Sequence, residues 1–277
     1  MTNHLRAPLA AAIALAGCHA SAPPPAPSTS AATAAPSLTV AHSAEKAHAM
    51  HHRILIAMTS HDRKGDTGAP TGAYLPEIAR PYDVLTRAGY EVEFASVRGG
   101  RVPLDGVDPK DEISAAFLRG PAAARLHASL ASSAIDPARY DAILFAGGHG
   151  AMWDLPGDAA FAAATAAIYE HGGVVAAVCH GPAALVDVRL SSGAYLVAGK
   201  EVSGFTNEEE RAVGLDHVVP FLLEDRLVAR GGRFRGAPMW QDQVVVSDRL
   251  VTGQNPASAT SVARRVVDEL ARLAPAR

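Results

Sequence analysis

Short apolar runs alternate along this chain with longer segments in which apolar residues recur at helical spacing. The runs with the length and composition of buried strands are residues 54–58, 91–96, 142–146, 174–178 and 250–252. The segments with a helical pattern are residues 75–88, 158–171 and 256–273. This alternation predicts an α/β fold of the doubly wound type, with a mostly parallel sheet and helices on both faces, as in a flavodoxin-like three-layer sandwich.

The carboxyl ends of the predicted strands carry glycines and polar residues. Sheets of this type bind their ligands in the crevice beyond these ends. The segments concerned are residues 59–61, 147–150, 179–180 and 253–256. We therefore expect the functional groups to come from these loops.

One strand end has the features of a nucleophile's position. Cys179, one of two cysteines in the chain, directly follows the apolar run 174–178 and precedes Gly181 and Pro182. A strand, a sharp turn and a helix present the nucleophile in many hydrolases. Unpaired N–H groups at the start of that helix are predicted to lower the pKa of the thiol and favour the thiolate. The alternative is a buried cysteine that packs as a small apolar residue.

The glycine-rich segment 147–150 follows another predicted strand. Glycines let the backbone approach a ligand and direct N–H groups at it. The N–H groups of Gly148 and His180 are our candidate donors for an oxyanion hole beside Cys179. A phosphate-binding loop is the alternative, but the usual glycine spacing of such loops is absent.

Several other positions have both a functional and a structural interpretation. Glu77 and the run from Glu208 to Glu210 stand where helices are predicted to begin, where acidic residues are common. The pairs Met152-Trp153 and Met239-Trp240 are predicted to wall a narrow apolar site near the strand ends. Packing in the core is the alternative for the tryptophans.

Composition and charge restrict the class of protein. The chain has 277 residues, of which 48% are hydrophobic, and this is enough for one sizeable core. The formal net charge is -3, and no basic cluster is present, so we expect no nucleic-acid partner. After the first twenty residues, no apolar run is long enough to cross a bilayer.

The first fifty residues differ from the rest. Residues 1–18 combine Arg6, an apolar run and Leu15-Ala-Gly-Cys18, which resembles the lipobox of bacterial lipoproteins. We therefore predict export, lipidation of Cys18 and a periplasmic or cell-envelope lipoprotein whose only membrane contact is this terminus, with a plain secretory signal as the alternative. Residues 19–50 are rich in Ala, Pro, Ser and Thr and are predicted to form a disordered tether. Residues 51–277 are predicted to form one catalytic domain.

Six segments of the predicted domain carry a family resemblance. They are Ile54-Leu-Ile-Ala-Met-Thr-Ser60, Thr71-Gly-Ala-Tyr-Leu-Pro-Glu77, Ala146-Gly-Gly-His-Gly150, Ala176-Ala-Val-Cys-His-Gly-Pro182, Gly204-Phe-Thr206 and Leu250-Val-Thr-Gly-Gln-Asn-Pro-Ala-Ser258. Together they resemble the PfpI superfamily, whose members are related to the class I glutamine amidotransferases. Within it the chain is most similar to the branch of glutathione-independent glyoxalase III and heat-shock chaperone-like proteins.

The resemblance implies roles for individual residues. Cys179 would be the nucleophile, His180 the neighbouring general acid and base, and Glu77 the carboxyl group that hydrogen-bonds the thiol. Gly148 and His149 would line the oxyanion and substrate site. The position six residues after Gly204 is Glu210, which would orient His180, but the sequence leaves open which of Glu208, Glu209 and Glu210 completes the triad.

The resemblance also implies an activity, namely conversion of methylglyoxal and related 2-oxoaldehydes to 2-hydroxy acids without glutathione, cofactor or metal. It leaves protein deglycation open as a related activity, and it implies a homodimer. A stress-related holding chaperone is one alternative, for which Cys179 would be dispensable. A cysteine peptidase or amidase is another, which would need an open cleft rather than a small pocket.

Overall fold

The computed structural model describes residues 53–273, and the predictions for residues 1–18, for residues 19–50 and for lipidation of Cys18 lie outside this range. At the centre is a seven-stranded sheet of strand order β10-β11-β7-β6-β1-β3-β5. The strands of this sheet are β1 (Arg53–Met58), β3 (Glu91–Ser96), β5 (Leu130–Ala131), β6 (Ala142–Phe145), β7 (Val174–Val178), β10 (Val244–Ser247) and β11 (Leu250–Gly253). All neighbours pair in parallel except β10, which is antiparallel to β11.

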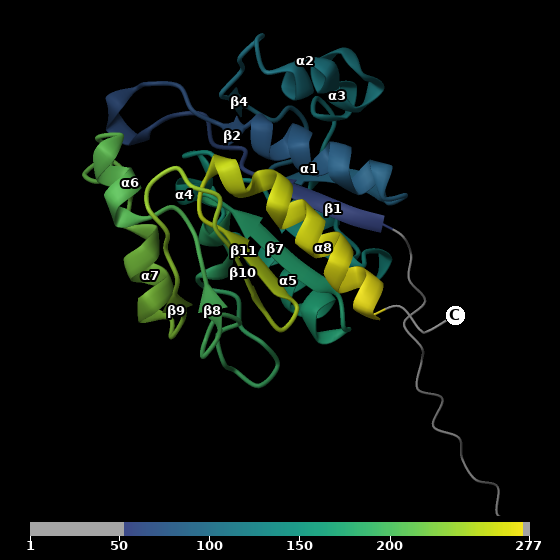
Figure 1. Ribbon diagram of the computed structural model, residues 1–277, viewed down its shortest axis with the longest axis vertical. Helices are drawn as coiled ribbons and strands as arrows, with labels where there is room; N and C mark the ends of the chain where they lie inside the picture. Colours follow the sequence, from purple (N-terminus) through teal and green to yellow (C-terminus); the bar gives the residue numbers. More distant parts are fainter. Residues whose placement is uncertain (1–52, 274–277) are drawn as a thin grey trace, which may run out of the picture. The chain divides into compact units, whose positions relative to one another are not determined.

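Helices cover both faces of this sheet (Figure 1). The α-helices are α1 (Pro76–Arg87), α2 (Glu112–Arg119), α3 (Pro121–Arg125), α4 (Ala151–Asp154), α5 (Ala159–Glu170), α6 (Asn207–Ala212), α7 (Leu223–Ala229) and α8 (Ala259–Leu273). Short 3-10 helices are η1 (Gly65–Thr67), η2 (Ser132–Ala134), η3 (Pro137–Arg139), η4 (Gly181–Leu185) and η5 (Pro256–Ser258). Helices α1 and α8 pack side by side on one face, and α5 packs against β6 and β7 on the other. The strand order runs both ways from β1, which places these crossover helices on opposite faces.

Two small parallel sheets lie outside the central one: β2 (Ala73–Tyr74) with β4 (Leu104–Asp105), and β8 (Glu201–Val202) with β9 (Arg233–Phe234). The predicted fold class is confirmed, and each predicted strand agrees with an observed one to within one residue at each end. The predicted helix 256–273 begins instead as the 3-10 turn η5, and α8 follows from Ala259.

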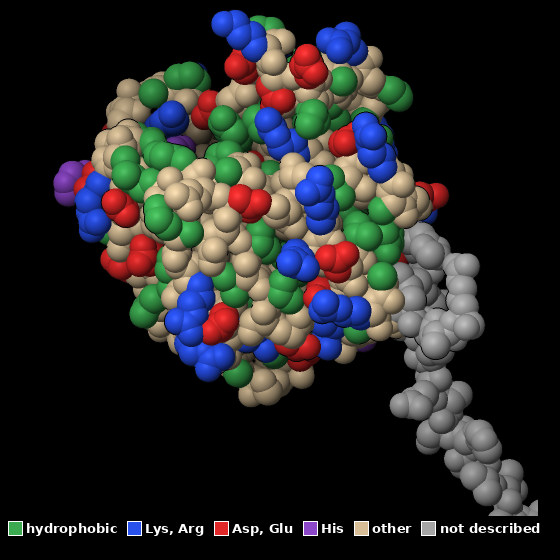
Figure 2. Space-filling model, viewed as in Figure 1, with side chains coloured by type: hydrophobic (Ala, Val, Ile, Leu, Met, Phe, Trp, Pro, Cys, Tyr) green, Lys and Arg blue, Asp and Glu red, His purple; other side chains and the backbone are tan. Residues whose placement is uncertain are grey.

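The central strands β1, β6 and β7 are buried from end to end apart from Arg53. Their continuous apolar content is typical of parallel strands covered on both faces. On the face drawn in Figure 2, basic and acidic side chains are interspersed. Among residues 53–273, no helix is long and apolar enough to span a bilayer.

Candidate active site

Cys179 lies at the carboxyl end of β7 in a sharp backbone turn. Its φ is 59°, in the left-handed region, where a non-glycine residue costs about 1–2 kcal/mol. Two backbone hydrogen bonds hold this turn: the Cys179 N–H donates to the Gly253 carbonyl at 3.0 Å, and its carbonyl accepts from the Phe205 N–H at 2.8 Å. At Gly181 a side chain would lie 2.3 Å from the Phe145 carbonyl oxygen, so glycine is required there. The predicted sharp turn at Cys179 is therefore present.

Cys179, His180 and Glu210 form a hydrogen-bonded triad. The Cys179 Sγ lies 3.3 Å from His180 Nδ1, and His180 Nε2 lies 2.9 Å from Glu210 Oε2. The three residues are 4%, 1% and 2% exposed. Of the three consecutive glutamates, Glu210 is therefore the one that reaches His180, whereas Glu208 is exposed on the surface of α6. The offset that the family resemblance implied thus selects the glutamate that contacts His180, and its catalytic role stays a prediction.

A second imidazole shares the same carboxylate. His149 Nε2 lies 3.0 Å from Glu210 Oε1, and the rings of His149 and His180 are 4.2 Å apart, centroid to centroid. A carboxylate only accepts, so each imidazole donates its Nε2–H to one oxygen of Glu210. This network assigns the tautomer of His180 and leaves Nδ1 as an acceptor facing the thiol. The sequence had indicated His149 for substrate binding and gave no sign of this contact.

The protonation states follow from burial and from these hydrogen bonds. Burial lowers the pKa of His180 to about 4, and the neighbouring His149 adds to this effect against the opposing influence of Glu210. Burial alone would raise the pKa of Glu210, but the hydrogen bonds from His149 and His180 outweigh it and hold that pKa at about 2. At neutral pH the pair is thus a neutral imidazole and an ionised carboxylate, which suits a general base.

Glu77, in the first turn of α1, is fully buried next to the thiol. Its Oε2 accepts a hydrogen bond from the Gly147 N–H at 2.7 Å. Its Oε1 has no hydrogen-bond partner in the described part of the chain, and the carboxyl group interacts with the Cys179 thiol. Burial raises the pKa of Glu77 to about 8, despite the opposing hydrogen bonds from Gly147 and Cys179. The carboxyl group is therefore protonated at neutral pH and can donate its proton to the sulfur.

The expected lowering of the thiol pKa is wrong. Burial raises the pKa of Cys179 well above its ordinary value, and a negative charge on Glu77 would raise it further. The N–H groups of Gly148 and His180, which contact the sulfur as expected for the oxyanion donors, lower it only in part. The helix that was expected to favour the thiolate is only the short 3-10 segment η4. The resting group is therefore a thiol, and His180 Nδ1 lies where it can accept the thiol proton.

Three side chains of the site lie close enough together to hold a metal ion. One ligand atom from each of His149, His180 and Glu210 lies within 4.8 Å of the others. These atoms already satisfy one another by hydrogen bonds, so an ion would have to replace the proton on both Nε2 atoms. The thiol chemistry of Cys179 needs no such ion, and the absence of a metal cofactor stays a prediction.

The two tryptophan pairs have different surroundings. Met152 is buried in the core, and Trp153 beside it stacks on His61 with ring centroids 5.1 Å apart. Trp240 is 48% exposed and lies over Phe205, whose ring contacts that of His180 at 4.3 Å. An aromatic series thus leads from the surface to the catalytic imidazole. Trp240 therefore contacts the site through Phe205, and its role as a wall stays a prediction, whereas Met152 packs in the core.

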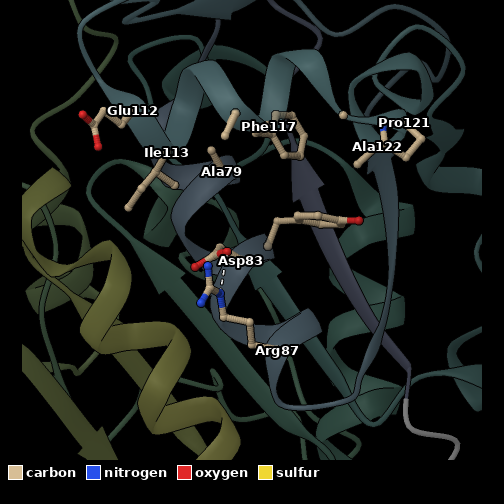
Figure 3. Close-up of a pocket in the computed structure, with 11 residues that line it drawn as sticks. Ala79, Asp83, Arg87, Glu112, Ile113, Phe117, Pro121 and Ala122 are labelled. Atoms are coloured by element: carbon tan, nitrogen blue, oxygen red, sulfur yellow. Dashed lines mark hydrogen bonds and ion pairs between the residues drawn. The ribbon is translucent and has the colours of Figure 1, made fainter.

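A groove of about 440 Å³ lies away from this site, between α1 and the α2–α3 segment. Figure 3 shows Ala79 of α1 and Ile113 and Phe117 of α2 along it, together with the ion pair between Arg87 and Asp83. None of the triad residues lines this groove. The groove is therefore separate from the thiol chemistry.

Comparison with known proteins identifies the family. The DJ-1/PfpI family model matches residues 71–269. The chain is 33% identical to the glutathione-independent glyoxalase HSP31 of Saccharomyces cerevisiae over 237 residues, which cover 79% of this chain and 98% of the relative. It is 30% identical to glyoxalase 3 of Candida albicans over 233 residues, 78% of this chain and 97% of the relative.

Solved structures give the same result. The Rapid Encystment Protein of 24 kDa from Francisella tularensis superposes with a TM-score of 0.77 at 38% identity and covers 79% of this chain and 98% of its own. Glyoxalase III of Candida albicans superposes with a TM-score of 0.74 at 28% identity, with the same coverage. The family model matches more than half of the chain, and the yeast relative is aligned over nearly its whole length. The chain belongs to the DJ-1/PfpI family.

Proposed function

We propose that this protein converts 2-oxoaldehydes such as methylglyoxal to 2-hydroxy acids, as a glyoxalase of the glutathione-independent type. The observation that carries the proposal is the buried arrangement of Cys179, His180 and Glu210 with the protonated Glu77 beside the sulfur. The relatives named glutathione-independent glyoxalase HSP31 and glyoxalase 3 support it.

The first half of the reaction adds the thiol to the aldehyde. His180 Nδ1 takes the proton of Cys179, and the sulfur bonds to the aldehyde carbon to give a hemithioacetal. The oxygen that becomes negative lies beside the sulfur, where the N–H groups of Gly148 and His180 can donate to it. Returning the proton from His180 to this oxygen leaves a neutral adduct and a free base. Glu210 stabilises the imidazolium while it exists.

The second half moves hydrogen from one carbon to the next. His180 removes the proton from the former aldehyde carbon, which gives an enediolate, and returns it to the neighbouring carbon. The remaining hydroxyl proton passes to the second oxygen, so the product is a thioester of a 2-hydroxy acid on Cys179. One water molecule then cleaves the thioester and restores the thiol. The net change is the addition of water to the substrate, and no electron carrier is required.

The burial of the site favours a small substrate over a polypeptide. Cys179, His180 and Glu210 are all nearly inaccessible to solvent. A peptidase or amidase must admit an extended chain, which needs an open cleft. The geometry therefore supports small aldehydes before protein substrates, and deglycation would require the modified side chain to reach the same thiol.

The test is product formation by the purified protein and by Cys179→Ala. Incubation of the wild-type protein with methylglyoxal, with no glutathione present, is expected to yield lactate. Cys179→Ala is expected to yield none while it unfolds at nearly the same urea concentration. Trapping of the thioester on the Cys179 peptide by mass spectrometry would confirm the intermediate. Equal lactate formation by the variant would refute the proposal.

A holding chaperone is the second candidate, because apolar side chains are exposed on α2 and in the loop that precedes it. They are Val107, Ile113 and Leu118. If the protein protects unfolded clients through this surface, Cys179→Ala should suppress the aggregation of a heated client as well as the wild type does. Loss of protection in Cys179→Ala would speak against this second function.

We also propose that the protein is an exported lipoprotein anchored through Cys18, and that it forms a homodimer. The sequence Leu15-Ala-Gly-Cys18 after an apolar run supports the first part. Incorporation of labelled fatty acid into the wild type but not into Cys18→Ser tests it. Light scattering at several protein concentrations tests the dimer.

A further inference from the structure

Glu209 is a buried carboxylate that the proposed reaction does not use. It is inaccessible to solvent and accepts five hydrogen bonds. The donors are the N–H and Oγ1–H of Thr206, the N–H of Trp240, Nε2 of Gln254 and Nδ2 of Asn255, at 3.1, 3.0, 2.9, 3.1 and 2.8 Å. Five donors on one buried carboxylate indicate that Glu209 links several segments of the chain; we call this arrangement the Glu209 junction.

These five bonds join three separate segments of the chain. Oε2 of Glu209 accepts both bonds from Thr206, at the start of α6, and completes a capping box there. Oε1 accepts the bonds from the β11 end and from the loop that precedes β10. Gln254 and Asn255 hold that loop a second time, through the Ala237 N–H and carbonyl and through the Gln241 carbonyl. The family segments 204–206 and 250–258 thus meet at Glu209.

The loop held in this way carries Trp240. Its φ is 65°, in the left-handed region that bulky residues rarely adopt. The only backbone donor of Trp240 points at Glu209, which fixes this conformation. The indole ring then lies 5.8 Å from the ring of Phe205, centroid to centroid, and Phe205 covers the imidazole of His180. Release of the Trp240 N–H would therefore free the outermost member of this aromatic series.

We infer that Glu209 is a positioning residue that holds Trp240 as one wall of the substrate entrance, and that this wall restricts the site to 2-oxoaldehydes with small substituents. The inference rests on the proposed function for its substrate class. It assigns different roles to three consecutive glutamates: Glu208 is a solvated surface charge, Glu209 holds the wall and Glu210 orients the catalytic imidazole.

Glu209→Gln is the first test, because it keeps the shape of the side chain. An amide has one acceptor oxygen and one NH2 group, so it cannot accept from Thr206 on one side and from Trp240, Gln254 and Asn255 on the other. In the variant, the NH2 group therefore faces hydrogen-bond donors on one side of the side chain, either those of Thr206 or those of Trp240, Gln254 and Asn255. The matched control is Glu208→Gln, the same change at the exposed neighbouring position. Trp240→Ala is the second test, since it removes the wall without altering the buried carboxylate.

Two measurements on the full-length protein distinguish a positioning role from a merely structural one. The first is kcat/KM for phenylglyoxal relative to methylglyoxal, which is expected to rise by about tenfold in Glu209→Gln and in Trp240→Ala, the scale on which pocket shape separates substrates. The second is the rate at which iodoacetamide alkylates Cys179, followed by peptide mass mapping, and it should rise in both variants. Glu208→Gln should match the wild type in both measurements.

The inference is overturned if Trp240→Ala leaves both the substrate ratio and the alkylation rate unchanged, whatever happens to the stability of Glu209→Gln. It is also overturned if a folded Glu209→Gln matches Glu208→Gln in both. Alkylation does not depend on turnover, so it tests the wall even if the wild type forms no 2-hydroxy acid. If the wild type forms no 2-hydroxy acid, only the proposed function is refuted. A raised alkylation rate of Cys179 in Trp240→Ala would still support the role of Trp240 as a wall.

Discussion

Because the carboxyl group of Glu77 is neutral in the folded protein, we expect the free energy of unfolding to decrease as the pH rises. Its pKa is raised from the ordinary 4.5 to about 8, because the group is fully buried beside Cys179. The folded state therefore binds a proton that the unfolded state releases at neutral pH. The stabilisation from this proton is complete below pH 4.5 and is lost as pH rises through 8.

The size of the effect follows from the two pKa values. Between pH 4.5 and 8, each pH unit lowers the free energy of unfolding by about 1.4 kcal/mol. Over the whole interval the loss is on the order of 5 kcal/mol. Glu77→Gln removes this titration and keeps the contacts, because its amide oxygen can accept from the Gly147 N–H while its NH2 group donates to the sulfur. The difference in unfolding free energy between wild type and variant should therefore fall by about 4 kcal/mol from pH 5 to pH 8.

Urea unfolding followed by circular dichroism at a series of pH values measures this difference. Groups that titrate alike in both proteins cancel, and Glu208→Gln, an exposed change, should show no pH-dependent difference from wild type. The activity gives an independent readout: the wild type should lose kcat/KM above about pH 8, and Glu77→Gln should retain it there. If the stability difference between wild type and Glu77→Gln is constant across this range, Glu77 is ionised in the folded protein and the reasoning is wrong.

Three further predictions concern the triad. Glu210→Gln should lower kcat by about a hundredfold, the scale of a general acid–base contribution, while Glu208→Gln does not change it. The pKa of His180 is lowered to about 4, so kcat/KM should persist in mild acid and fall only as pH drops through that value; a loss centred near 6.5 would contradict this. A chelator should leave activity unchanged, whereas added Zn²⁺ should inhibit by binding His149, His180 and Glu210, and His149→Gln should weaken that inhibition in an assay of initial rates.

The central sheet could be predicted because its signals are local. Buried parallel strands appear as continuous apolar runs, and the runs at β1, β3, β6, β7 and β11 are of this kind. The edge strand β10 was missed, because its four residues pair antiparallel in a short hairpin with β11 that has no helix between the strands. The short helices α2, α3 and α7 were missed because none has more than eight residues, too few for a helical repeat of apolar positions to stand out in the sequence.

The site was predictable in its residues but not in its electrostatics. Cys179 and His180 are marked by the strand and the turn, and the family offset selects Glu210. The pKa of Cys179 depends on burial that only the folded chain creates, so the direction expected before folding was considered is wrong. Glu209 carried a readable signal that was not used: Thr206 followed three residues later by glutamate is a capping-box pattern, which places Glu209 at the third position of α6 and Glu210 directly after it.

The capping box at the start of α6 couples the geometry of this short helix to that of the site. The register in which Thr206 and Glu209 pair is the register in which Glu210 meets both imidazoles. If this turn opens transiently, Glu210 separates from His180 and the loop that carries Trp240 is released at the same time. A partly assembled site would then not accumulate. Amide hydrogen exchange in α6 would then report the fraction of molecules that are competent for catalysis.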